Sequence, residues 1–98
     1  MPLKVAFTPK AARDLDRIEA SIANESSAAI ASNYIASIYR RCQRIALAPD
    51  QGTKLHNQRP GIRTTGFARR VSIAFYLKSE TVVILSVAYG GRQHRKRL

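Results

Sequence analysis

The sequence predicts an α+β fold of order β-α-α-β-β-β, in which a helical hairpin packs on one face of a mostly antiparallel sheet. Three observations predict it. Residues 71–77 alternate large apolar with smaller or polar side chains, the period of two expected of a strand. Residues 82–89 are apolar on both faces, as in a centrally placed strand. Residues 9–48 carry apolar side chains at helical spacing, with one interruption at 24–27.

The two C-terminal strands are predicted to form a hairpin. The segment 71–77 has one large apolar face made of Val71, Ile73, Phe75 and Leu77. A polar connection, 78–80, is short enough to join this segment to residues 82–89 directly. We therefore expect 71–77 and 82–89 to pair in antiparallel fashion.

The N-terminal half predicts one strand and two helices. Residues 3–7 alternate as a strand does, and Thr8 followed by Pro9 is typical of a helix start. The first helix should reach about residue 23 and the second should run over about 28–48, where Pro49 stops it. Their apolar stripes are formed by Ala11, Leu15, Ile18 and Ile22 in the first, and by Ala31, Ile35, Ile38, Cys42 and Ile45 in the second.

The middle of the chain predicts a loop and a short strand. Residues 49–61 have no period and contain two Pro and two Gly, which indicates a surface loop. A loop of that length in so small a protein is often functional. A short strand is expected over 61–65, after which 66–68 turns the chain into the next strand.

Length and composition predict one cytoplasmic domain, residues 1–98, with 92–98 as a basic tail. No apolar run approaches the roughly 18 residues of a spanning helix, so no membrane partner is expected. The single cysteine, Cys42, excludes an intrachain disulfide and is predicted to be a buried apolar residue.

The charge balance predicts an anionic partner. Lys and Arg number 17 against six Asp and Glu, a net charge of +11. Four of the six acidic residues lie within 14–25, so the positive field belongs to the sheet side and the tail. Nucleic acid, an acidic protein segment and an anionic membrane surface all fit such a field.

The familiar catalytic and metal-binding motifs are missing from the sequence, which predicts no metal and no cofactor. Asp14 and Asp16 are two residues apart and point to different faces of a helix, so they do not form an acid–base pair. We expect both carboxylates to be solvated partners of Arg13 and Arg17.

A cluster of cationic and hydroxylated side chains remains. If the 49–61 loop, the start of the next strand and the end of the last strand meet in one concave patch, arginine guanidinium groups there would suit phosphates or carboxylates. The candidates are Lys54, His56, Arg59, Arg63, Arg69, Arg70, Tyr89, Arg92 and His94.

The ordered set of these features resembles a known family. The opening strand leading to T-P-K-A-A-R-D-L-D-R-I, the L-A-P-D-Q-G after the second helix, R-P-G-I-R at 59–63 and V-V-I-L-S-V-A-Y-G-G-R-Q at 82–93 are similar to the ParE branch of the ParE/RelE toxin superfamily, the plasmid stabilisation proteins. The family commonly ends its last strand with H-G-x-R-D, where this chain has Tyr89 and Gln93 at the His and acidic positions.

The resemblance implies the toxin of a type II toxin–antitoxin module. ParE-like toxins are described as inhibitors of DNA gyrase and are not themselves nucleases, so the favoured interpretation is an inhibitory binder with no catalytic residues. The residues expected to contact gyrase or the antitoxin are Arg59, Arg63, Arg69, Arg70, Tyr89, Arg92, Arg95, Lys96 and Arg97.

Two alternatives stay open. The first is a ribosome-dependent mRNA endoribonuclease of the RelE type, which would need Lys54, Arg63, Tyr89, Arg92 and His94 to converge. The second is a non-toxic nucleic-acid-binding module. The toxin interpretations also imply a cognate acidic antitoxin that folds on the basic surface, in a hetero-oligomeric complex, with direct nucleic-acid binding secondary.

Overall fold

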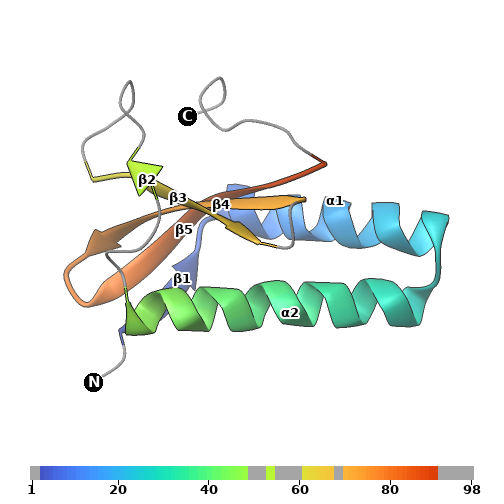
Figure 1. The fold of residues 1–98 in the computed structure, drawn as a ribbon, viewed down its shortest axis with the longest axis horizontal. Coiled ribbons are helices and arrows are strands. Elements are labelled where there is room, and N and C mark those ends of the chain that lie inside the picture. The colour runs from blue at the N-terminus through green and yellow to red at the C-terminus, as the bar shows by residue number, and fades with distance from the viewer. Residues whose placement is uncertain (1–2, 49–52, 55–60, 68–69, 91–98) are drawn as a thin grey trace.

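The computed structural model describes residues 3–48, 53–54, 61–67 and 70–90, with the side chains of residues 53, 54 and 67 left aside. The elements in chain order are β1 (Lys4–Phe7), α1 (Pro9–Glu25), α2 (Ala28–Leu47), β2 (Thr53–Lys54), β3 (Arg63–Phe67), β4 (Val71–Lys78) and β5 (Thr81–Tyr89). Figure 1 shows one twisted sheet with α2 below it and α1 behind it.

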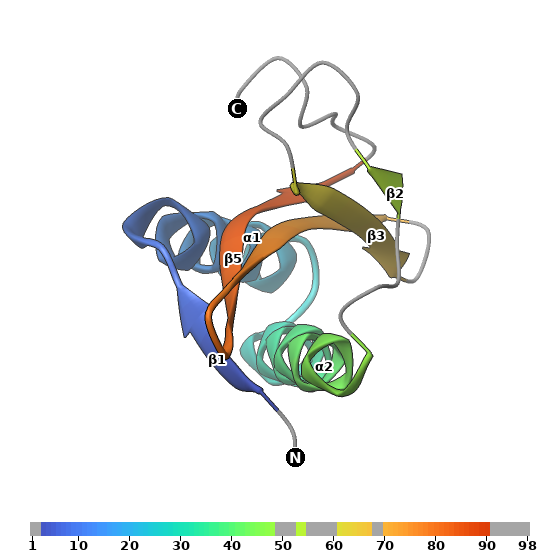
Figure 2. The same cartoon turned by 90° about the vertical axis from the view of Figure 1, so that its left-hand side faces the viewer.

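The five described strands form one sheet of order β1-β5-β4-β3-β2, with β1 parallel to β5 and the other neighbours antiparallel. Figure 2 shows both helices on the same face of this sheet. The predicted α+β architecture is therefore confirmed. Two details differ from the prediction, because β2 lies inside the predicted loop and β3 continues through Gly66 to pair with β4.

Both helices begin where the sequence indicates. The hydroxyl oxygen of Thr8 accepts a hydrogen bond from the backbone N–H of Ala11 at 3.0 Å, and Pro9 follows at the first helical position. The hydroxyl of Ser27 caps α2 in the same way, accepting from the N–H of Ile30 at 3.1 Å. These side chains satisfy backbone donors that have no partner within the helix.

The core lies between the helical hairpin and the centre of the sheet. Its apolar side chains come from both helix stripes and from β4 and β5, and the largest fully buried ones are Phe75, Ile38, Ile45, Ile73 and Ile84. β5 lies between β1 and β4, so it is paired along both edges over much of its length. Val82 and Ile84 are fully buried in the core, whereas Val83 and Leu85 between and beside them are half-buried, so one face of β5 is buried more deeply than the other.

Leu77 departs from the predicted apolar face. The side chains of Val71, Ile73 and Phe75 are at most 3% exposed, whereas Leu77 is 50% exposed. Leu77 precedes the tight turn between β4 and β5, and Figure 1 shows that this hairpin extends past α1. Alternation therefore placed Leu77 on the correct face, since its partner Val82 on β5 is fully buried, but Leu77 lies beyond Phe75, the last residue of β4 that pairs with β3.

Cys42 is fully buried in the core, as predicted, and burial raises the pKa of its thiol from 9.0 to about 12. Because the thiolate is the nucleophile, we expect alkylation by iodoacetamide at pH 8 to be roughly 1,000-fold slower in the folded protein than in guanidinium. Mass spectrometry of timed samples measures both rates. Equal rates in the two conditions would contradict this placement.

The same pKa shift predicts a loss of stability in alkali. The folded-state pKa lies above the ordinary value, so the stability that protonated Cys42 contributes is complete below pH 9 and is lost as the pH rises toward 12. Denaturation of Cys42→Ala at pH 8 and pH 10.5, beside the unmodified chain, should show a weaker pH dependence in the variant.

Candidate target-binding site

Three of the predicted site residues have described side chains. Arg63 opens β3 and is half-buried, Arg70 precedes β4 and is exposed, and Tyr89 ends β5 and is half-buried. Lys54 lies in β2 without a described side chain. The remaining candidates lie outside the described residues: His56, Arg59, Arg69, Arg92, His94, Arg95, Lys96 and Arg97.

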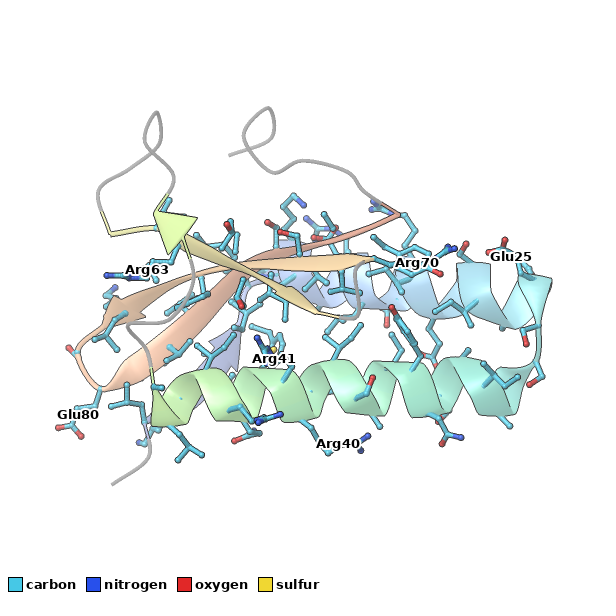
Figure 3. All side chains as sticks on the ribbon, in the orientation of Figure 1. Glu25, Arg40, Arg41, Arg63, Arg70 and Glu80 are labelled. Atoms are coloured by element: carbon cyan, nitrogen blue, oxygen red, sulfur yellow. The ribbon has the colours of Figure 1, made fainter. Side chains whose placement is uncertain are left out.

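Arg63 and Tyr89 do not come together. Arg63 is opposite Phe75 on β4, and Tyr89 is opposite Val71, four residues away along the same strand. That offset corresponds to roughly 13 Å, and the two residues also flank β4 on opposite sides. Figure 3 likewise shows Arg63 and Arg70 toward opposite ends of the sheet. The start of β3 and the end of β5 therefore do not form the single patch that the sequence suggested.

Tyr89 instead lies next to Arg70, which precedes the neighbouring strand β4, and packs against Tyr34 of α2. The backbone N–H of Gly90 donates to the carbonyl oxygen of Arg70 at 2.9 Å, which joins the end of β5 to the start of β4. The rings of Tyr34 and Tyr89 pack edge to face with centroids 5.9 Å apart. These contacts bring a cation and two phenols together at one end of the sheet.

The Tyr34 phenol in this cluster is protonated and is therefore able to donate a hydrogen bond. Burial raises the pKa of Tyr34, the nearby Tyr89 raises it further, and the positive charge of Arg70 lowers it in part. Because the net shift is upward, Tyr34 stays protonated at neutral pH. A protonated phenol beside a guanidinium suits a carboxylate or phosphate acceptor, and it does not supply a general base.

Arg41 is a site residue that the sequence analysis missed. Its Nη2 donates to the hydroxyl of Thr65 at 3.2 Å and to the carbonyl oxygen of Gly66 at 3.4 Å, so it bridges α2 to β3. Figure 3 shows Arg41 directed toward the sheet and Arg40 directed away from it. One sequence signal was available, because Arg41 lies seven residues from Tyr34 and thus on the same flank of the helix.

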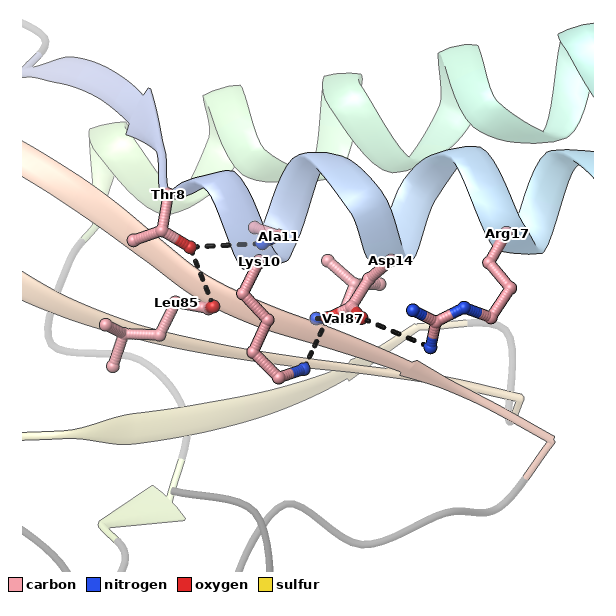
Figure 4. A network of polar contacts seen from close by, with 7 residues as sticks. All are labelled: Thr8, Lys10, Ala11, Asp14, Arg17, Leu85 and Val87. Atoms are coloured by element: carbon pink, nitrogen blue, oxygen red, sulfur yellow. Dashed lines mark hydrogen bonds and ion pairs between the residues drawn. The ribbon is translucent and has the colours of Figure 1, made fainter.

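Asp14 is also misplaced by the sequence analysis, which expected a solvated partner for Arg13 and Arg17. Asp14 is only 5% exposed, and its Oδ2 accepts from the backbone N–H of Val87 at 2.9 Å. Lys10 pairs with the same oxygen at 2.9 Å, whereas Arg17 is 3.9 Å from the other oxygen. Figure 4 shows Asp14 reaching from α1 onto β5.

The hydrogen bond from Val87 to Asp14 lies on the edge of β5 beyond the point where its pairing with β1 ends. β1 pairs with β5 only as far as Ile84, and β5 has a bulge at Leu85 before it continues to Tyr89. Thr8 donates its hydroxyl to the carbonyl oxygen of Leu85 at 2.9 Å, and Asp14 accepts from Val87 two residues later. The side chains of Thr8, which caps α1, and of Asp14 within α1 therefore satisfy backbone groups near the end of β5 that carries Tyr89.

A family model described as the ParE toxin of the type II toxin–antitoxin system parDE matches residues 5–94. A search of functionally curated proteins found no match. Within the described residues, neither helix is both long and apolar enough to cross a membrane.

Solved structures share the fold. A chromosomal ParDE toxin–antitoxin structure from P. aeruginosa is 25% identical with a TM-score of 0.76, covering 89% of this chain and 95% of that one. The toxin–antitoxin complex RelBE2 from Mycobacterium tuberculosis is 21% identical with a TM-score of 0.65, covering 91% and 99%. The latter likeness concerns the fold alone. Since the family model spans nearly all of the chain, this protein belongs to the ParE toxin family of type II toxin–antitoxin systems.

Proposed function

We propose that this ParE-family chain inhibits DNA gyrase and that a cognate acidic antitoxin neutralises it. The family match over residues 5–94 carries the proposal, because it favours the ParE branch over the other branch of the superfamily. The inhibition follows from binding and needs no catalytic residue of this chain. Its contact surface is proposed to include Arg70 and Tyr89, together with the basic residues 92–97.

The distribution of charge supports an acidic partner. The chain carries a net charge of +11, and the described segments of α2, β3 and β4 contain no Asp or Glu. Among the described residues, the carboxylates lie on α1 or, in the case of Glu80, in the turn between β4 and β5. An acidic antitoxin segment would meet complementary potential across α2 and the sheet, which speeds association and selects the partner.

The register of the sheet favours a binder over a nuclease. Cleavage of RNA through its 2′-hydroxyl requires a base and phosphate-binding cations around one phosphate. The two described candidates for that role, Arg63 and Tyr89, are roughly 13 Å apart along β4. A single phosphate does not reach both side chains at that separation without a large rearrangement of the sheet.

The decisive experiment titrates the free protein into a supercoiling assay with purified gyrase and relaxed plasmid. We expect supercoiling to be lost and linear DNA to accumulate, since a trapped gyrase leaves its DNA cleaved. Adding the proposed cognate acidic antitoxin should restore supercoiling. No effect at high molar excess would overturn the gyrase target, and ribosome-bound mRNA cleavage would then be tested with Arg63→Ala.

A matched pair of variants tests the surface. Arg70→Ala removes an exposed cation beside Tyr89 and should raise the inhibitory concentration about tenfold. Arg40→Ala removes an exposed cation on the side of α2 that faces away from the sheet and should leave inhibition unchanged. Equal losses in the two variants would indicate a general charge effect and contradict a defined surface at the end of β5.

A further inference from the structure

Two polar atoms on one flank of α2 are buried without a hydrogen-bond partner among the described residues. They are the hydroxyl of Tyr34 and the Nε of Arg41. Their residues are seven positions apart, which is about two helical turns or roughly 10 Å. Unpaired buried donors are rare in folded proteins. Two of them on the same flank of one helix therefore indicate that a hydrogen-bond acceptor from a partner binds there.

Both donors face the same part of the sheet. Arg41 contacts Thr65 and Gly66 of β3, while Tyr34 packs on Tyr89 beside Arg70. Thr65 and Gly66 of β3 pair with Ile73 and Ser72 near the start of β4, and Arg70 directly precedes β4. Arg70 is therefore close to these β3 residues along the sheet. We name this surface the α2–β3 seam and define it by Tyr34, Arg41, Thr65, Gly66 and Arg70.

The seam is cationic and has no carboxylate of its own in the described part of the chain. Neither Arg41 nor Arg70 forms an ion pair with a described residue. Figure 3 places Glu25 and Glu80 at opposite ends of the molecule, well away from Arg41. The existing hydrogen bonds of Arg41, at 3.2 and 3.4 Å, are long for a guanidinium, so a carboxylate would form shorter and stronger ones.

We propose that the α2–β3 seam binds an acidic segment of the antitoxin, with one carboxylate on Arg41 and a second accepting from Tyr34 and pairing with Arg70. This proposal rests on the proposed function for the identity of the partner. The proposal requires a negatively charged hydrogen-bond acceptor at each of two places, one at Arg41 and one at Tyr34 and Arg70. Hydrophobic contact alone would leave both buried donors unpaired.

The separation of Tyr34 and Arg41 along α2, roughly 10 Å, is used to set the spacing of the acidic residues. In an extended segment of the polyproline II type, side chains three residues apart share a face and lie about 9 Å apart. In a helix, side chains seven residues apart lie about 10 Å apart. The partner should therefore carry Asp or Glu at one of these two spacings.

A blocked tetrapeptide, Glu-Ala-Ala-Glu, tests the site without the antitoxin and without gyrase. It is titrated into the folded, ¹⁵N-labelled protein while the Arg41 Nε–H signal is followed by NMR. We expect a saturable shift with the Glu peptide and none with Gln-Ala-Ala-Gln at equal concentration. Absence of saturation, or equal shifts with both peptides, would overturn the proposal even if the chain inhibits gyrase.

Two conservative variants separate binding from folding. Tyr34→Phe removes only the unpaired hydroxyl, so Tm should stay equal or rise while affinity for the Glu peptide falls about fivefold. Tyr39→Phe is the matched control, because Tyr39 packs on Phe7 away from the seam and should bind the peptide normally. Unchanged affinity in Tyr34→Phe would refute the role of the hydroxyl.

The full partner provides an independent measurement. Arg41→Met keeps the length of the side chain but removes its charge, and it should weaken the complex with the proposed cognate antitoxin at least tenfold. Inhibition of gyrase by the free variant should persist, since Arg41, unlike Arg70, is not part of the proposed gyrase surface. If Arg41→Met binds the antitoxin normally, the seam is not its docking site, whatever the outcome of the gyrase assay.

Discussion

Replacing Asp14 with Ala is expected to destabilise the protein by about 2–4 kcal/mol. Asp14 is 5% exposed and accepts from the backbone N–H of Val87, which has no strand neighbour on that side among the described elements. The substitution leaves this N–H without an acceptor and frees Lys10 from its 2.9 Å ion pair. Urea denaturation followed by circular dichroism measures the change in the free energy of unfolding.

Two companion variants identify the cause. Asp16→Ala removes an exposed carboxylate of the same helix and should change stability by less than about 0.5 kcal/mol. Asp14→Asn keeps an oxygen that can accept from Val87 and should recover part of the loss. If Asp14→Ala is as mild as Asp16→Ala, the contact between α1 and β5 does not stabilise the fold.

Replacing Phe75 with Ala is expected to have the largest effect on stability, about 3–5 kcal/mol. Phe75 is 1% exposed and is the largest of the fully buried side chains. Its removal opens a cavity between the sheet and the helices, and close-packed neighbours collapse into such a space only in part. The same denaturation measurement applies, with hydrogen exchange of the β4 amides as a second observable.

Leu77→Ala is the matched control on the same strand and the same face. Leu77 is 50% exposed, so its truncation removes little buried area and should destabilise by less than about 1 kcal/mol. The contrast between the two variants tests where the buried part of β4 ends. A loss for Leu77→Ala close to that for Phe75→Ala would mean that a further part of the molecule covers this end of the hairpin.

Much of the fold could be predicted because its signals are local. Helix stripes, the caps at Thr8 and Ser27 and the alternation of 71–77 depend on residues close together in sequence. Gly66 was misread as part of a turn because glycine weakens a strand signal. The two-residue β2 has too few residues to show a period, and only its pairing with β3 defines it.

The candidate site was harder to predict because register decides it. Arg63 and Tyr89 both lie near strand ends in the sequence, but the offset between strands separates them along β4. Arg41 was not among the candidates from the sequence, although it lies on the flank of α2 that faces β3. Asp14 was misread because its partner, the backbone N–H of Val87, lies 73 residues away in the sequence. The residues around position 14 do not indicate that this N–H requires an acceptor.

The sequence by itself determined the order of the elements, the apolar face of each helix, the net positive charge and the family, since each depends on residue type and local spacing. Tertiary structure alone decided which polar side chains are buried, because burial depends on what packs against a helix flank. It placed Asp14 at the open edge of β5 and left the Tyr34 hydroxyl and Arg41 Nε buried without a described acceptor. Unpaired hydrogen-bonding groups arise only when distant segments meet, and for that reason the seam was invisible in the sequence.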